Sequence, residues 1–369
     1  MRKTSEYSKE QGSEAKEPLL KPQMKIQQRW SRFISGPGSA VVLVCSLLVV
    51  VGMVIFYPIW ATALSHLRLP SVPQETRKAS PPFDPALGAV LPRHRVVAYY
   101  AVPGSEVTGP AFEPSESMYE KLREQGAAYE QLDPAHPVQS GVDLVVSVPD
   151  SFPGPDGYYS HHVDARTIQS YVDFCQRHQL LLFLDLNFGR APVMKELTSF
   201  LPYLQRYSFV HLAVDPEWMF PRHDGVPGVN LSNVHASDLN PIIEALATIP
   251  MKYHVPRKML IFHQYRGDGD SLTDPFDATQ AELADKHKLL ADKRVDVILH
   301  VDSVGGYQGD HEDKKKQYAE WVGQDMKQYH NFRYGGFKLF YHIEAATGLM
   351  TPADVLAMKP APLVITYGN

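Results

Sequence analysis

Residues 208–218 read Ser-Phe-Val-His-Leu-Ala-Val-Asp-Pro-Glu-Trp, an apolar run that closes on two acids and a tryptophan. The apolar part, 208–214, is typical of a buried strand. Asp215-Pro216-Glu217-Trp218 then ends the run, because proline is not accepted inside a central strand. In parallel α/β sheets the functional side chains lie at the carboxyl ends of the strands. The stretch therefore predicts a parallel strand with a functional end.

The same pattern recurs along the chain from residue 95 onward. Apolar runs occur at 96–102, 142–148, 180–186, 209–215, 259–265, 295–302, 337–343 and 363–367. Segments with apolar residues three or four apart separate them, at 115–132, 165–179, 192–207, 235–249, 278–293 and 312–328. Strands that alternate with helices indicate a parallel sheet.

Eight such strands predict an α/β fold of the (β/α)8 TIM barrel type, in which 209–215 is the fourth strand. A doubly wound sheet is the alternative, but it does not need eight strands, and no glycine-rich phosphate loop follows the first one. No helix follows 363–367, so we expect a barrel that lacks the final helix. We expect residues 83–92 to cover the last strand instead.

Polar residues at the strand ends share one parity within each strand, and side chains alternate across a strand. The polar set comprises Asp185, Asn187, His211, Asp215, Glu217, His300, Asp302, Lys338, His342 and Glu344. The opposite parity is aliphatic at Leu184, Leu186, Leu212, Val214, Leu299, Val301 and Leu339. The pattern predicts that the polar set points into the barrel and the aliphatic set packs under the helices.

The residues before the barrel predict a membrane anchor. Residues 1–38 are polar and typical of a disordered tail. Residues 39–65 carry no charge and exceed the roughly 20 residues that span a bilayer, so we expect a transmembrane signal-anchor helix rather than a cleaved signal peptide. Residues 66–94 read as a Pro-rich linker to the barrel domain, 95–369.

The distribution of basic residues predicts how this anchor is oriented. The tail carries eight Lys and Arg residues, and fewer follow the apolar segment. This bias predicts a single-pass protein with a cytoplasmic N-terminus and an extracytoplasmic barrel domain.

Composition excludes several classes of function. The net charge of −5 and the lack of any nucleic-acid motif argue against a nucleic-acid partner. The chain has two cysteines, Cys45 and Cys175, in different segments, so no disulfide framework is indicated.

The polar strand ends suggest glycoside hydrolysis, which needs two carboxyl groups that face each other across a sugar. Glu217 is the expected acid/base and Glu344 the expected nucleophile, with Asp215 raising the pKa of Glu217 by like-charge proximity. The expected substrate-binding residues are Asp185, Asn187, Trp218, Tyr99, Tyr100, His263, Gln264, Asp302 and Tyr341. The expected partner is a carbohydrate or cell-envelope glycan, without a cofactor or metal.

Several motifs also resemble those of known families. Glutamates after the fourth and seventh strands resemble the retaining glycosidases with (β/α)8 barrels, although Pro216 stands where that clan has Asn. Asp215-Pro216-Glu217 resembles barrels of the chitinase and lysozyme type, which carry a longer string of aspartates. The runs 182–186, 211–217, 338–341 and 349–356 resemble an uncharacterised group of bacterial exported or membrane-anchored TIM-barrel proteins, which implies an extracytoplasmic barrel.

Two other functions fit the same residues. A divalent-metal-dependent hydrolase or isomerase would use oxygen ligands and one imidazole, from Asp185, Asp215, Glu217, His263 and Asp302. A non-catalytic module for a glycan or protein would keep the pocket without the chemistry, since a fold does not fix a function.

Overall fold

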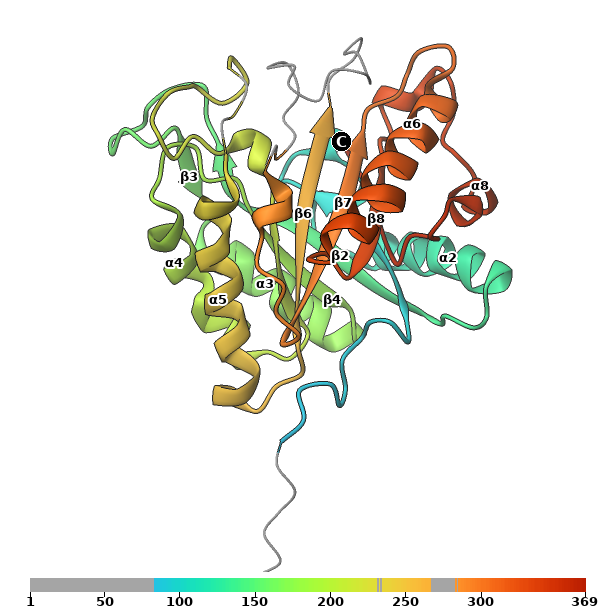
Figure 1. The fold of residues 1–369 in the computed structure, drawn as a ribbon, viewed down its shortest axis with the longest axis horizontal. Helices are drawn as coiled ribbons and strands as arrows, with labels where there is room; N and C mark the ends of the chain where they lie inside the picture. Colours follow the sequence, from blue (N-terminus) through green and yellow to red (C-terminus); the bar gives the residue numbers. More distant parts are fainter. Residues whose placement is uncertain (1–82, 231, 233, 267–282, 284) are drawn as a thin grey trace, which may run out of the picture. The chain divides into compact units, whose positions relative to one another are not determined.

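The computed structural model describes residues 83–230, 232, 234–266, 283 and 285–369, and its parallel strands close into an α/β barrel of the TIM type (Figure 1). The eight barrel strands are β1 (Arg95–Ala101), β2 (Val138–Pro149), β4 (Leu181–Leu186), β5 (Val210–Val214), β6 (Lys258–Arg266), β7 (Val295–Ser303), β8 (Tyr334–Leu339) and β9 (Val364–Tyr367). Each pairs in parallel with the next, and β9 pairs with β1 to close the barrel. The short β3 (Ser160–His162) pairs antiparallel with the end of β2. The predicted barrel is confirmed.

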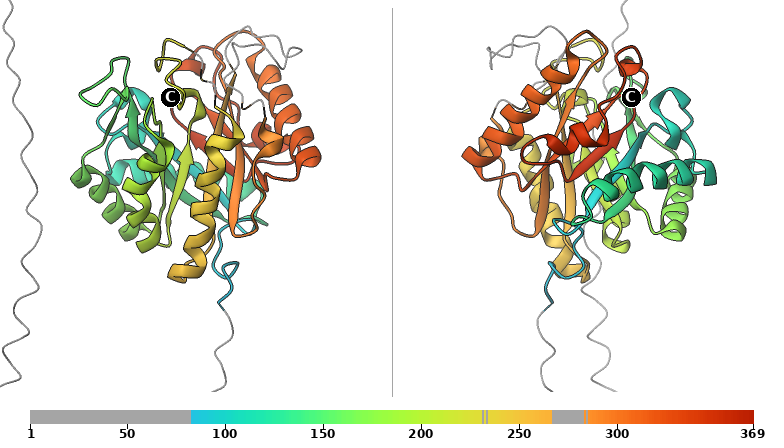
Figure 2. Two further views of the ribbon diagram at one scale, coloured as in Figure 1. Left: turned by 60° about the vertical axis from the view of Figure 1, so that its left-hand side comes forward. Right: turned by 90° about the vertical axis from the view of Figure 1, so that its right-hand side faces the viewer.

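Helices surround the strands (Figure 2). They are α2 (Glu116–Leu132), α3 (Ala165–His178), α4 (Val193–Arg206), α5 (Ala236–Tyr253), α6 (Asp310–Tyr318), α7 (Met326–Tyr329) and α8 (Pro352–Ala357), with the π-helix η5 (Ala319–Asp325) joining α6 to α7. The short 3-10 turns are η1 (Glu106–Thr108), η2 (Pro110–Phe112), η3 (Pro216–Trp218), η4 (Lys286–Lys288) and η6 (Ile343–Ala345). Of the helix expected at 278–293, the described residues form only η4, and residues 278–282 and 284 lie outside them.

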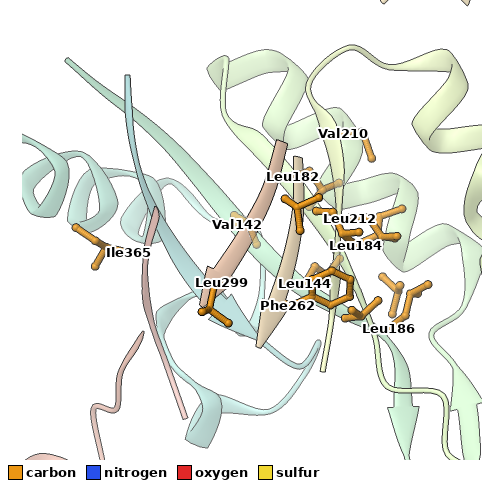
Figure 3. Packing of buried hydrophobic residues seen from close by; sticks show 14 of the residues in the cluster. Val142, Leu144, Leu182, Leu184, Leu186, Val210, Leu212, Phe262, Leu299 and Ile365 are labelled. Carbon is orange, nitrogen blue, oxygen red and sulfur yellow. The ribbon is translucent and has the colours of Figure 1, made fainter. Parts of the chain in front are cut away.

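Two apolar layers build the core, and they follow the predicted parity. The outward layer contains Leu184, Leu186, Leu212, Val214, Leu299, Val301 and Leu339, which pack with the helices; Figure 3 shows several of them. The inward layer contains Val96, Ala98, Leu181, Phe183, Ala213, Met259, Ile261, Ile298 and Val364. These inward residues fill the amino-terminal part of the barrel. The inward positions nearer the carboxyl ends are polar, so the sequence divides the interior into an apolar base and a polar mouth.

Residues 83–94 lie across the amino-terminal end of the barrel and do not cover the last strand as expected. Leu91 is 1% exposed and belongs to the inward apolar layer. Arg257, which precedes β6, donates from its backbone amide to Pro85 and from Nη2 to Leu91 O. Figure 1 shows this segment at the end opposite to the C-terminus. The part of the predicted linker that the structure describes is therefore packed against the barrel.

Strand β8 begins and ends earlier than the sequence predicts. The prediction was 337–343, whereas the strand covers Tyr334–Leu339. The apolar-run criterion missed Gly335 and Gly336, since glycine is ordinarily weak in strands. Here a Cβ on Gly335 would lie 2.5 Å from Tyr318 Oη, and one on Gly336 would lie 2.3 Å from His300. The glycines let β8 pass close to those side chains, and the residues after Leu339 leave the barrel wall.

No helix among the described residues is long and apolar enough to cross a membrane. The predicted transmembrane segment, 39–65, lies outside the described residues.

Candidate functional site

A cavity of about 480 Å³ opens at the carboxyl ends of the strands, where the sequence placed the site. It is lined by Tyr100, Asp215, Glu217, Trp218, Gly228, Val229, Asn230, Asp302, Val304, Lys338, Phe340, Ile343 and Asn369. Five of these were predicted site residues, namely Tyr100, Asp215, Glu217, Trp218 and Asp302. Asp185 and His263 are buried on inward-facing strand positions and Asn187 is buried just after β4, but none of the three lines the cavity itself.

The turn after β5 places Glu217 and Trp218 on the cavity wall. Asp215 is extended, and η3 begins at Pro216, whose fixed φ suits the first position of a helical turn. The turn is held from outside, because Gly189 N donates to Trp218 O at 2.9 Å. Gly189 has φ +55, and a Cβ there would lie 2.3 Å from Tyr158 O. Only glycine fits this close approach, so the loop after β4 fixes the geometry of the acidic turn.

The two acids of this turn have raised pKa values. Burial, followed by the charge of Asp215, raises the pKa of Glu217 well above its ordinary value. Burial also raises the pKa of Asp215 to about 6, although His263 and Lys338 oppose the shift. No described residue donates a hydrogen bond to the Glu217 side chain, and the residue is partly exposed. Glu217 therefore presents a carboxyl group with a raised pKa to the cavity.

Asp302 differs from Glu217 and Asp215, because its pKa is lowered and not raised. Burial would raise its pKa, but His263, Lys338 and His300 together hold the pKa of Asp302 well below its ordinary value. Its oxygens lie 2.9 Å from His263 Nδ1, 2.6 Å from His300 Nδ1 and 3.1 Å from Lys338 Nζ. Asp302 is therefore an ionised carboxylate whose oxygens are already engaged.

Lys338 is the cation of the cavity wall. Its Nζ lies 3.7 Å from the centre of the Tyr100 ring, in a cation–π contact. Burial lowers the pKa of Lys338, but Asp302 and Asp215 outweigh it and raise the pKa above its ordinary value. Lys338 therefore stays charged although it is 4% exposed. The sequence placed Lys338 in the inward polar set without assigning it a role.

Asp143 on β2 is a site residue that the sequence analysis missed. It is fully buried, and its Oδ2 lies 3.2 Å from His263 Nε2. A signal was present, because Asp143 is the one charged residue in the apolar run 142–148. Two further residues of the cavity wall, Asn230 and Asn369, carried no strand-end signal. Asn369 is held by a bond from its Nδ2 to Val107 O at 2.8 Å.

Three predicted substrate-binding residues point away from the cavity. Tyr99 and Tyr341 pack in the outward layer, with ring centroids 6.2 Å apart. Gln264 accepts a bond from Leu283 N at 3.1 Å and holds a connecting segment. Tyr99 and Gln264 lie one position along the strand from inward residues, so their side chains lie on the opposite face.

Glu344, the expected nucleophile, does not line the cavity. It lies in η6, because β8 ends at Leu339, and it is fully buried. Its Oε1 accepts a bond from Lys314 Nζ of α6 and another from Phe340 N at 3.3 Å. A Cβ on Gly305 would lie 2.9 Å from Glu344 Cγ, so the acid packs behind the loop after β7. This environment fits a structural ion pair and not a partner for Glu217 across a sugar.

The variant Glu344→Gln is expected to lower the free energy of unfolding by about 3 kcal/mol, because Lys314 keeps its buried charge and loses its ionised partner. Chemical denaturation of the full-length protein measures this. Glu312→Gln is the matched control, since Glu312 pairs with Lys315 on the same helix but its side chain is 75% exposed. An equal, small effect in both variants would contradict the structural role of Glu344.

No protein-family model matches the chain, and no curated protein matches it. The fold and the site nevertheless define a class of protein. The molecule is an α/β barrel whose carboxyl-terminal mouth holds a raised-pKa carboxylic acid beside an ionised, fully engaged carboxylate.

Proposed function

We propose that the protein is a glycoside-hydrolase-like enzyme and that Glu217 is its proton donor. The observation that carries the proposal is the position of Glu217 on the cavity wall with a pKa well above its ordinary value. A glycosidase needs such an acid to protonate the leaving oxygen.

Asp215 is the second carboxylate of the proposed reaction. It lines the cavity beside Glu217, and its Oδ1 has no protein hydrogen-bond partner. An ionised Asp215 can stabilise the positive charge that develops on the sugar ring in the transition state. Asp302 is less suited to this role, because His263, His300 and Lys338 already bind its oxygens. In this proposal Asp302 anchors the site and keeps the cation Lys338 in place.

Trp218 is the proposed platform for a sugar ring. It lines the cavity next to Glu217 and is partly exposed. An aromatic face offers a broad apolar surface to the C–H groups of a sugar. Tyr100 also lines the cavity, but Lys338 Nζ already occupies a position over its ring. Trp218 is therefore the proposed contact for the sugar ring, and Tyr100 stabilises the charge of Lys338.

The substrate class follows from the proposed location. Residues 39–65 are the proposed anchor, and the barrel domain would lie outside the cytoplasm. A cell-envelope glycan is then the substrate that such a tethered barrel reaches. The sequence resemblance to bacterial exported barrels supports the same location.

A glycan-binding module without hydrolysis is the second candidate. One observation favours it, namely that Glu344 is engaged by Lys314, so among the described residues Glu217 is the one glutamate on the cavity wall. A binding module would retain the apolar and aromatic cavity wall without needing a paired acid.

The test is to screen the full-length protein against a panel of cell-envelope glycans for binding and for release of new reducing ends. We expect both. Glu344→Gln, assayed as folded protein, is expected to cleave at the wild-type rate, because its carboxyl does not reach the cavity. Binding without cleavage would support the second candidate, a glycan-binding module. Loss of cleavage in well-folded Glu344→Gln would show that Glu344 takes part in the reaction.

A further inference from the structure

Three buried side chains converge inside the barrel next to the proposed reaction site. Asp143 on β2, Asp185 on β4 and His263 on β6 each offer a ligand atom, and these atoms lie within 4.8 Å of one another. Asp143 and Asp185 are 0% exposed and His263 is 1% exposed. None of the three lines the cavity. The cluster is therefore distinct from Glu217 and Asp215.

Three of the four carboxylate oxygens of this cluster lack protein partners. Both carboxylate oxygens of Asp185 and Oδ1 of Asp143 are buried without a hydrogen bond. Asn187, two residues further along the chain from Asp185, also has both polar side-chain atoms buried and unbonded. Buried polar atoms in native proteins are almost always satisfied, so these oxygens are available to an ion or to ordered water. Carboxylate oxygens on two strands beside an imidazole are donors that suit a cation.

Asp302 orients His263 for such a role. His263 Nδ1 lies 2.9 Å from Asp302 Oδ2, which leaves Nε2 directed toward Asp143. Metal-bound histidines commonly donate their second ring N–H to a carboxylate in this way. A second group, formed by His263, His300 and Asp302, also has the spacing of a metal site. There the Asp302 oxygens already contact His263, His300 and Lys338, so that group needs no ion.

We propose that Asp143, Asp185 and His263 bind one divalent cation, with Mn²⁺ or Zn²⁺ as the best fit. Carboxylate oxygens suit Mn²⁺, and an imidazole ligand selects a borderline metal over Ca²⁺ or Mg²⁺. Neighbouring ligands of an ion with bonds of about 2.1 Å are about 3 to 3.5 Å apart. The 3.2 Å between Asp143 Oδ2 and His263 Nε2 matches this spacing, and all three ligand atoms lie within 4.8 Å of one another. The ion would satisfy the oxygens that now lack a partner.

This inference adds a metal to a site for which the sequence predicted none in the carbohydrate reaction. It also differs from the metal-dependent hydrolase considered above, because Glu217 and Asp215 are left as the reacting acids and the ion has a structural position. Metal content and glycan cleavage are separate measurements, so failure of one proposal does not decide the other.

The experiment measures metal in full-length protein that has been stripped with chelator and reloaded with Mn²⁺ or Zn²⁺. We expect one ion per chain by elemental analysis and a melting temperature that rises by at least about 4 °C at a hundredfold excess over Kd. Asp185→Asn is expected to weaken binding at least about 100-fold. His300→Gln is the control, since His300 belongs only to the second group, and it is expected to retain the ion.

Two results would overturn the proposal. One is reloaded wild-type protein without stoichiometric metal and without a thermal shift, which would leave these oxygens to buried water. The other is loss of the ion in His300→Gln together with its retention in Asp185→Asn, which would assign the ion to the second group. If Asp185→Asn fails to fold, Asp143→Asn takes its place, and the wild-type loading experiment decides without any variant.

Discussion

Glu217→Gln is expected to lower the rate of glycan cleavage by about 10³-fold while glycan binding changes by less than about threefold. The amide has nearly the shape of the acid and cannot deliver the proton that the leaving oxygen needs. Cleavage is measured by release of reducing ends and binding by calorimetry. Glu244→Gln makes the same substitution at an exposed position of α5 and is expected to leave both quantities unchanged.

Two measurements distinguish proton donation by Glu217 from a merely structural role. They are the dependence of activity on the leaving group and its dependence on pH. An activated aryl glycoside needs little protonation, so Glu217→Gln is expected to lose much less activity on it than on a natural glycan. The acid works only when protonated, and burial and Asp215 raise the pKa of Glu217 well above its ordinary value. Wild-type activity should therefore persist as pH rises and fall only above that raised pKa. Equal losses on both substrates, with an unchanged pH profile, would contradict the assignment.

Lys338→Met is expected to lower the free energy of unfolding by about 3–5 kcal/mol, because it removes the cation from a buried pair and leaves the Asp302 charge behind. Lys338 Nζ lies 3.1 Å from Asp302 Oδ2, and both residues are nearly fully buried. Chemical denaturation at neutral pH measures the loss. Methionine is unbranched and close to lysine in length, so it retains most of the packing, and the effect chiefly reports the loss of the charge at Nζ.

The double variant Lys338→Met/Asp302→Asn provides the control. Removing both charges should restore part of the stability, since the carboxylate that lost its lysine is gone and a double-mutant cycle isolates the pairwise interaction. Additive losses would show that the two charges do not interact. A loss below about 1 kcal/mol in Lys338→Met alone would place the pair among the weak, solvent-screened ion pairs.

The two faces of each barrel strand could be predicted from the sequence, because the alternation of side chains is a local property of one strand. Each apolar run has period two along a strand, so Leu184, Leu212 and Leu299 had to share a face and Asp185 and Asp302 the other. The same rule placed Asp215 and Glu217 at the mouth. It needed no knowledge of which strands are neighbours.

The prediction failed where the position of a side chain depends on the end of a strand or on a neighbouring element. Gly335 and Gly336 belong to β8 because they pair with β7, and Tyr318 and His300 leave no room for a Cβ at these positions. No local pattern shows those neighbours. The strand ends at Leu339, and Glu344 lies in the later turn η6, where Lys314 binds it. A shift of a few residues at one strand end was enough to remove the expected nucleophile from the cavity.

The sequence by itself determined the number of strands, the parity of their side chains and the end of the barrel that carries the acids, since alternation is a property of a single strand. Only the tertiary structure decided which polar residues meet, because contacts between strands depend on register and closure. Asp143 and Asp302 are far apart in the chain, yet both bind His263 inside the barrel. The contact with His263 makes Asp302 an engaged carboxylate, unlike Glu217 on the cavity wall. The contact with Asp143 helps to bring together the oxygens to which we assign a cation.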